Sequence, residues 1–476
     1  MQIPIDGLRK EQILHTLESY KQHDLPWRSG RVLAYTYDPG QDAEEVAKAA
    51  FLMYLSENAL DPTTYPSLMR LEREVVRMVA NLLRGDADVV GNFTWGGTES
   101  ILLAVKTARD WARVHKPHIK RPQMIVPRTA HCAFHKAAAY FGLDLVLTPF
   151  DEVTYQADVE AMARAITDNT VLLVGSAPGY AHGVIDPIEA IGRLAQERKL
   201  LFHVDGCVGG IHLSLMRKYG YDLPPFDFTV PGVTSMSADM HKYGYSPKGA
   251  SVVLYRNKEL RRFQIFASAK STTYALINPT VLSTKSGGPM AAAWATLHFM
   301  GEKGYERIVR GVMNATQRMV DGINAIPGLY VLGKPHMCMF SFASDEINVY
   351  ELADEMKLRG WYLQPQFSVE GSPPNLHVTV NQGSVSVVDA FLADLGDAVA
   401  AIRANPDRID SAAVRAQVEA LLASGDEASP AGLAAMVGIN GTDLPDRMAL
   451  LNTVLDILPD SVTEDLLIDF VNDLYV

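Results

Sequence analysis

Cysteine is scarce in this sequence. Only three occur among 476 residues, and Cys132, Cys207 and Cys338 lie far apart. An odd and widely spaced set argues against a disulfide framework and is typical of a reducing compartment. We therefore expect free thiols and a cytoplasmic location.

Long apolar runs and an excess of positive charge are also missing. No stretch of about 18 or more uncharged apolar residues is present, so we expect no transmembrane segment. Charges between Asp6 and Glu11 interrupt the N-terminus, so we expect no signal peptide. The formal net charge of −12 argues against a nucleic-acid partner, because such binding needs Lys and Arg to displace counterions.

Most of the negative charge lies near the C-terminus. Residues 406–476 contain many more Asp and Glu residues than the three arginines Arg408, Arg415 and Arg447. Amphipathic spacing predicts helices over 412–423 and 461–474. We predict an acidic helical tail, and its composition favours a solvated appendage over a docking or regulatory element.

The middle of the chain alternates short apolar strands with helices. Strands are predicted at 124–126, 145–147, 171–174, 200–204 and 251–255, with helices such as 99–115 between them. This alternation predicts an α/β fold with a large, mostly parallel sheet, whose ligand lies at the carboxyl ends of the strands.

Other segments frame this core. The first 60 residues read as irregular apart from a helix at about 42–57, and further helices are predicted over 67–83, 289–301 and 304–326. A smaller α+β segment with a strand at 375–380 follows. We therefore predict four parts: an N-terminal segment (1–60) that contributes to the active site and dimer, a large α/β domain (61–288), linking helices with a small α+β domain (289–405), and the acidic tail (406–476).

A glycine pair opens one of the central helices. In Trp95-Gly96-Gly97-Thr98-Glu99-Ser100 the glycines permit close backbone approach, two hydroxyls are at hand, and the helix N-terminus offers free amides. This arrangement suits a phosphate, although an ordinary helix cap is an equal alternative. It is neither a P-loop nor a dinucleotide fingerprint.

An aspartate and a lysine follow at strand ends. Asp205 ends an apolar strand, where it either caps a loop or holds a pyridine nitrogen protonated. Lys242 stands among small residues in Ser237-Ala238-Asp239-Met240-His241-Lys242, where the bland alternative is a surface charge. We expect burial to lower the pKa of Lys242, because a neutral amine is what a Schiff base requires.

Together these motifs supply a phosphate anchor, a pyridinium partner and an aldehyde anchor. In these stretches the chain resembles the fold-type-I pyridoxal-phosphate enzymes, specifically their group II decarboxylase branch. The run Lys242-Tyr243-Gly244-Tyr245-Ser246-Pro247-Lys248-Gly249 is most similar to the sphingosine-1-phosphate lyases of that branch. Further matching stretches lie at residues 58–62, 96–101, 178–187 and 203–210.

The resemblance implies a set of roles for the cofactor pyridoxal 5'-phosphate. Lys242 would bind its aldehyde and Asp205 its ring nitrogen, and His131 would stack on the ring. Its phosphate would be held by Gly97, Thr98 and His241, and by Thr284 of a neighbouring subunit. The resemblance thus implies a homodimer with shared active sites.

The same resemblance implies substrate contacts. Tyr37 and Lys248 match two of three family residues that bind the substrate phosphate, whereas Asp61 stands where the third, a histidine, is expected. A carboxylate repels a phosphate, so either Lys248 pairs with Asp61 and offsets the repulsion, or the phosphate is bound differently, or the substrate is not a phosphorylated sphingoid base. Tyr180 and Lys248 are our candidates for proton transfer.

The implied reaction is a retro-aldol cleavage of a phosphorylated sphingoid base into a fatty aldehyde and phosphoethanolamine. The alternative is decarboxylation of aspartate, glutamate or an aromatic amino acid by the same cofactor. A metal site at His131, Cys132 and His135 lacks further ligands at a useful spacing, so we expect no metal. A scaffold protein without catalysis is disfavoured because both Lys242 and Asp205 are present.

Overall fold

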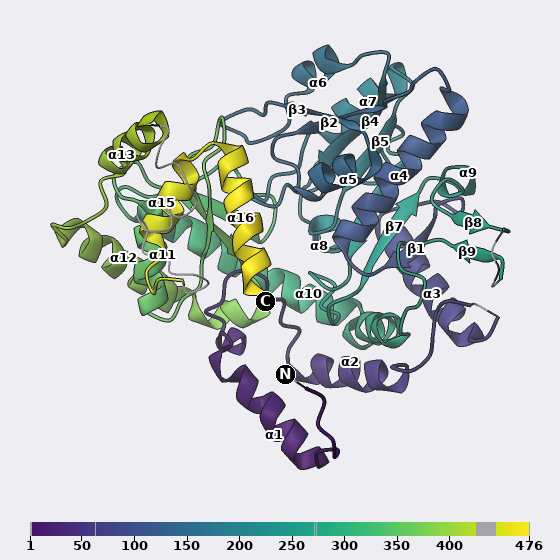
Figure 1. The fold of residues 1–476 in the computed structure, drawn as a ribbon, viewed down its shortest axis with the longest axis horizontal. Coiled ribbons are helices and arrows are strands. Elements are labelled where there is room, and N and C mark those ends of the chain that lie inside the picture. Colours follow the sequence, from purple (N-terminus) through teal and green to yellow (C-terminus); the bar gives the residue numbers. More distant parts are fainter. Residues whose placement is uncertain (1, 62, 271, 273, 425–443, 476) are drawn as a thin grey trace.

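Seven strands form the central sheet of the larger domain (Figure 1). The computed structural model describes residues 2–475 except residues 62, 271, 273 and 425–443. The strands occur in the order β1-β7-β6-β5-β4-β2-β3, and β7 alone runs antiparallel to its neighbours. Their bounds are β1 Val90–Thr94, β2 Gln123–Pro127, β3 Asp144–Thr148, β4 Thr170–Ser176, β5 Leu201–Asp205, β6 Ser235–Asp239 and β7 Ser251–Tyr255.

Both faces of this sheet are covered by helices. Along β4, Leu173 joins one apolar cluster, whereas Leu172 and Val174 join another, because successive side chains of a strand point to opposite faces. The first cluster includes residues of α3 Pro66–Leu82, α6 Val159–Ala165, α7 Ile188–Glu197, α8 Gly209–Lys218 and α10 Gly288–Ala325. The second includes residues of α4 Gly97–His115 and α5 Ala133–Phe141. The predicted α/β class with a mostly parallel sheet is confirmed.

The N-terminal segment departs from the prediction. It contains α1 Lys10–Tyr20 and α2 Gln41–Met53, so the expectation of an irregular chain before residue 42 is wrong. Helix α1 projects from the body of the molecule and buries none of its side chains (Figure 1). The spacing of Ile13, Leu14 and Leu17 was the available signal for this helix.

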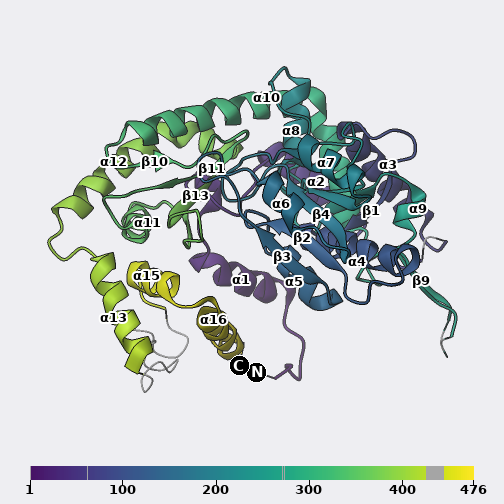
Figure 2. The same ribbon diagram turned by 90° about the horizontal axis from the view of Figure 1, so that it is seen from above.

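A long kinked helical element, α10, connects the two domains and runs along the molecule from the large domain to the small one (Figure 2). The predicted helices over 289–301 and 304–326 are confirmed as two helical segments that meet at a kink within α10. Its backbone leaves helical geometry at Gly301, where φ is 52°, a value that glycine adopts without steric cost. Among the described residues, no helix combines the length and the apolar character needed to cross a bilayer.

The smaller domain is built on an antiparallel sheet, in the order β10-β11-β13-β12. Helices α11 Val349–Leu358 and α12 Val388–Ala404 belong to the same domain. The strands are β10 Tyr330–Val331, β11 Met339–Ala343, β12 Gln364–Gln366 and β13 Asn375–Thr379. A separate pair, β8 Phe266–Ser268 and β9 Leu276–Asn278, follows the short helix α9 Lys258–Arg261.

The C-terminal helices α13 Ser411–Ser424, α15 Ala449–Ile457 and α16 Asp460–Leu474 have a small apolar core of their own. This core joins Val418, Leu451, Val454 and Leu458. Buried Asp354 of α11 attaches the group to the small domain, because its two oxygens accept the backbone N–H groups of Met448 and Ala449, at 3.0 and 2.9 Å. The division of the chain at residues 60, 288 and 405 stays a prediction.

We predict that Asp354→Ala loosens the C-terminal helices. The substitution leaves two backbone N–H groups at the start of α15 without their acceptors, at a cost of about 1–3 kcal/mol. Hydrogen exchange of α15 amides measures the effect. Asp397→Ala, which removes an exposed carboxylate from α12, is the control. Equal exchange in both variants would show that Asp354 does not hold these helices.

Candidate active site

A cavity of about 560 Å³ lies where three neighbouring strands of the central sheet end. Ser176, Asp205 and Asp239 are the last residues of β4, β5 and β6, and all three line the cavity. The register of the ladders places Ser176 beside Asp205 and Asp205 beside Ser237. The site thus lies at the carboxyl edge of the sheet, as predicted for this architecture.

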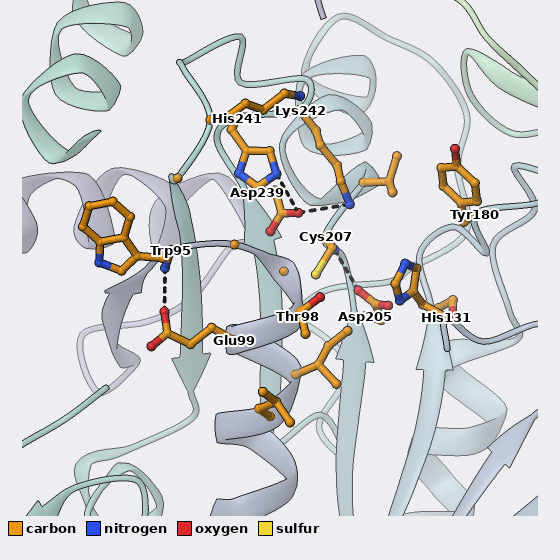
Figure 3. Close-up of a pocket in the computed structure, with 18 of the residues that line it drawn as sticks. Trp95, Thr98, Glu99, His131, Tyr180, Asp205, Cys207, Asp239, His241 and Lys242 are labelled. Atoms are coloured by element: carbon orange, nitrogen blue, oxygen red, sulfur yellow. Dashed lines mark hydrogen bonds and ion pairs between the residues drawn. The ribbon is translucent and has the colours of Figure 1, made fainter. Parts of the chain in front are cut away.

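The glycine turn after β1 forms one wall of this cavity (Figure 3). A side chain at Gly97 would place its Cβ 2.7 Å from the sulfur of Cys207 and 2.8 Å from a carboxylate oxygen of Asp239, so only glycine fits there. Thr98 follows and points toward the cavity. Glu99 accepts the backbone N–H of Trp95 at 2.7 Å, which closes the turn and leaves the first amides of α4 at the cavity wall.

Asp205 is a buried carboxylate with 7% of its surface exposed. It accepts the backbone N–H of Cys207 at 3.0 Å and the hydroxyl of Ser237 at 3.2 Å. Burial opposes its ionisation, but the interactions with nearby His131 and with the Cys207 N–H outweigh burial and hold the pKa of Asp205 below its usual value. The carboxylate is therefore charged at neutral pH.

His131 stands opposite the strand ends, on the loop before α5 (Figure 3). Its Nδ1 accepts the backbone N–H of Ala133 at 3.1 Å, which fixes the orientation of the ring. Interaction with Cys132 raises the pKa of His131, and the charge of Asp205 adds to this effect against the opposing influence of burial. The position agrees with a ring that covers a bound heterocycle.

Lys242 reaches into the cavity and forms an ion pair with Asp239, with 3.0 Å between Nζ and Oδ2 (Figure 3). Burial alone would lower the pKa of Lys242, but the Asp239 carboxylate outweighs it, and the pKa lies above its ordinary value. The expectation of a lowered pKa is therefore wrong for the cofactor-free chain. The missed signal was Asp239 itself, three residues before the lysine.

Two further predicted residues flank the lysine. His241 directs Nδ1 at the backbone oxygen of Ala250, at 2.8 Å, and its Nε2 lies 3.6 Å from Asp239. Tyr180 donates its hydroxyl to Gln364 of β12 at 2.7 Å and stacks on His377, with ring centroids 4.3 Å apart. Burial raises the pKa of Tyr180, which keeps its proton at neutral pH.

The structure also brings Tyr37 and Lys248 together, although 210 positions separate them in the sequence. The Lys248 ammonium lies over the Tyr37 ring, 4.6 Å from its centroid, and donates to the backbone oxygen of Tyr35 at 3.3 Å. Burial of this ammonium and the positive charge of Lys242 lower its pKa to about 8. Burial raises the pKa of Tyr37 to about 12.

Three predicted residues are not among those that line the cavity: Tyr37, which contacts Lys248, and the exposed residues Asp61 and Thr284. Asp61 is exposed and accepts the backbone N–H and the hydroxyl of Thr63, at 2.8 and 2.7 Å. The alternative that pairs Asp61 with Lys248 is wrong within one chain, because Lys248 is directed at Tyr35 and Tyr37. Thr284 is exposed on the loop that precedes α10.

Sequence reasoning missed the roles of three residues at the site. The hydroxyl of Ser176 is buried at the cavity and has no hydrogen-bond partner among the described residues. Asp239 pairs with Lys242, and Gln364 reaches Tyr180 from the small domain. The strand-end rule pointed to Ser176 and Asp239, but nothing in the local sequence marked Gln364.

The groups that line the cavity match the predicted cofactor. The glycine wall leaves room for an anion beside free helix amides, the orphaned Ser176 hydroxyl calls for a polar ligand atom, and Asp205 is charged at the cavity floor. Pyridoxal phosphate carries a phosphate, a basic ring nitrogen and an aldehyde, and therefore fits these groups and Lys242 at once. The fold and the site define a pyridoxal-phosphate-dependent enzyme.

Comparisons with known proteins agree. The family model of the pyridoxal-dependent decarboxylase conserved domain matches residues 26–344. A second model, described as "Pyridoxal-dependent enzyme, C-terminal putative HTH domain", matches residues 394–473 and so covers the acidic tail.

Two relatives are similar over most of their length. The sphingosine-1-phosphate lyase of Arabidopsis thaliana is 41% identical over 415 residues, which is 86% of this chain and 75% of that protein. The solved structure of a sphingosine-1-phosphate lyase from Burkholderia pseudomallei is 37% identical, with a TM-score of 0.81, over 90% of this chain and 97% of that one. The chain therefore belongs to the pyridoxal-dependent decarboxylase family and, within it, to the sphingosine-1-phosphate lyases. The predicted family, fold and cofactor are confirmed.

We predict that Lys242 alone attaches the cofactor. The purified protein should show a visible absorbance band that borohydride abolishes and that Lys242→Ala lacks, because the band reports the covalent bond to the lysine nitrogen. Absorption spectra and intact mass measure it. Lys248→Ala removes the neighbouring lysine and should keep the band. A borohydride-fixed mass increase in Lys242→Ala would contradict the assignment.

Proposed function

We propose that this lyase cleaves a phosphorylated sphingoid base, such as sphingosine 1-phosphate, by retro-aldol reaction into a fatty aldehyde and phosphoethanolamine. The carrying observation is a second cation in the cavity, Lys248, whose ammonium lies over the Tyr37 ring. The cofactor has one phosphate, so a second anion anchor fits a substrate with a phosphate of its own. The names of the relatives point to the same substrate.

The chain's own residues divide the chemical work. When bound, pyridoxal phosphate supplies an aldehyde for the substrate amine and a ring that accepts electrons from the broken bond. Asp205, charged and buried, holds the ring nitrogen protonated. His131 would cover one ring face, while Gly97, Thr98 and His241 would hold the phosphate.

Proton transfer falls to two groups at the mouth of the cavity. With its pKa lowered to about 8, Lys248 has a neutral fraction near physiological pH and accepts the proton of a substrate hydroxyl. Tyr180 keeps its proton because burial raises its pKa, and the phenol then serves as the donor. The hydrogen bond to Gln364 and the stacking on His377 orient that phenol.

The proposal includes a homodimer in the cytoplasm. Exposed Asp61 and Thr284 lie on loops outside their own cavity, so they are free to reach the cavity of a second copy. All three cysteines are free thiols, and Cys132 is exposed, which suits a reducing compartment. The strand pair β8–β9, which precedes the Thr284 loop in the chain, carries the exposed apolar side chains Phe266 and Ile277.

Amino-acid decarboxylation is the second candidate. A probable L-aspartate decarboxylase from Pyrococcus furiosus is 32% identical over 361 residues, 76% of this chain and 94% of that protein. Both reactions use the same electron sink, and the bond held perpendicular to the ring decides between them. The anchor formed by Tyr37 and Lys248 favours the lyase.

We predict that a sphingoid base phosphate yields a long-chain aldehyde and phosphoethanolamine, whereas aspartate, glutamate and aromatic amino acids release no carbon dioxide. Mass spectrometry of the products decides. Lys248→Met should raise KM for the phosphorylated base by about tenfold or more, since a charge-assisted contact is lost, and should also lower kcat, since the proposed proton acceptor is lost. The unphosphorylated base as substrate is the control. Carbon dioxide from an amino acid without any aldehyde product would refute the proposal.

Sharing of the active site is tested by subunit mixing. Thr284→Asp should repel the partner's cofactor phosphate, and Lys242→Ala removes the attachment point. Each variant alone should be inactive, whereas co-expression should restore roughly a quarter of the activity, because mixed dimers contain one intact site. Lys285→Met changes the residue next to Thr284, and its co-expression with Lys242→Ala controls for effects that do not depend on Thr284. No recovery, with mixed dimers shown by native mass, would mean that Thr284 acts within its own chain.

A further inference from the structure

A carboxylate forms part of the wall that is suited to a phosphate. The Asp239 side chain is fully buried, and its Oδ2 would lie 2.8 Å from a Cβ placed on Gly97. An anion at this place repels another anion and therefore counts against phosphate binding unless a cation compensates for it. An asparagine at position 239 would remove this repulsion, yet the chain has an aspartate there.

Two basic side chains face this carboxylate: the Lys242 ammonium and the His241 ring, which is charged only when it is protonated. Lys242 lies at 3.0 Å and His241 Nε2 at 3.6 Å from the same oxygen, Oδ2. Apart from these ionic contacts, neither oxygen of Asp239 has a hydrogen-bond donor among the described residues. Asp239 is thus placed to form an ion pair with either Lys242 or His241.

The hydrogen bond of His241 determines which protonation state of its ring can donate to a phosphate. Its Nδ1 faces the backbone oxygen of Ala250 at 2.8 Å, and a carbonyl only accepts, so Nδ1 carries a proton. In the neutral ring Nε2 is then a lone pair, which repels a phosphate oxygen. His241 donates to a phosphate only as an imidazolium, although burial lowers its pKa and disfavours that charge.

We propose that Asp239 is a shared counterion that turns His241 into a cationic phosphate holder. In the cofactor-free chain it pairs with the Lys242 ammonium. Once a phosphate occupies the glycine wall and Lys242 is committed to the cofactor aldehyde, Asp239 pairs with His241 and keeps Nε2 protonated. Asp239 is therefore a positioning residue, which acts through His241 and does not contact the reacting bond.

The alternative makes the opposite prediction. If Asp239 only repels the phosphate, then Asp239→Asn strengthens phosphate binding; if it sustains the imidazolium, the same substitution weakens it. Among the described residues, the charged and titratable groups that interact with His241 and Asp239 are Lys242, Lys248, Cys207 and Tyr37. All of them remain in the variant, so the sign of the change reports on Asp239 alone.

The experiment compares pyridoxal 5'-phosphate with pyridoxal, which lacks the phosphate, as ligands of the full-length cofactor-free protein. The ratio of their dissociation constants isolates the phosphate contribution, because both form the same bond to Lys242. Absorbance titration gives the constants without substrate, so the result is independent of the proposed reaction. We expect the preference for the phosphorylated ligand to fall about tenfold in Asp239→Asn, as for the loss of one charge-assisted hydrogen bond. An unchanged or stronger preference would overturn the proposal.

Two further variants sharpen the result. Asp205→Asn acts at the ring nitrogen, which both ligands share, and should leave the ratio unchanged. His241→Gln has no imidazolium for Asp239 to stabilise. Adding Asp239→Asn to this variant should therefore only remove repulsion and raise the preference for the phosphorylated ligand. If Asp239→Asn does not fold, the pH profile decides: the wild-type preference should fall with rising pH more steeply than that of His241→Gln. Parallel profiles would refute the role of the imidazolium.

Discussion

Everything at the site depends on charges that are held out of water at the carboxyl edge of one sheet. Asp205 and Asp239 end adjacent strands, and each is buried. A buried carboxylate persists only if a cation or a hydrogen-bond donor compensates for its lost hydration. Here His131 and the Cys207 amide compensate for the lost hydration of Asp205, and Lys242 does the same for Asp239. The sheet therefore fixes the electrostatic pattern before any ligand enters.

Local sequence patterns revealed the parts of the site that belong to strand ends. Asp205, Lys242 and the glycine turn at Gly97 each adjoin an apolar run, so the strand-end rule placed them at one edge. The protonation of Lys242 was not predictable in the same way. Small neighbours suggested desolvation, but the distance to Asp239 depends on how the turn after β6 folds back, and that turn decides the sign of the pKa shift.

Contacts between distant segments had no local signal. Gln364 meets Tyr180 because the small domain presents β12 toward the large one, and Lys248 meets Tyr37 because the N-terminal segment returns to the cavity. The fold class and the principal strands followed from periodicity. By contrast, α1 was not predicted, and its apolar residues Ile13, Leu14 and Leu17 are exposed because this helix buries nothing in the single chain.

The site has two separate groups of residues suited to an anion, one for the cofactor phosphate and one for the substrate phosphate. The glycine wall with His241 and Asp239 would form one anion position (Figure 3), and Lys248 over Tyr37 would form another at the same cavity. A lysine with a pKa of about 8 is a weak permanent cation, but an arriving phosphate would raise that pKa and strengthen its own anchor. Substrate binding would then consume the neutral amine that proton transfer requires. The two proposed roles of Lys248 are compatible only if its proton comes from the substrate hydroxyl itself, which ties the binding of the phosphate to cleavage of the neighbouring bond.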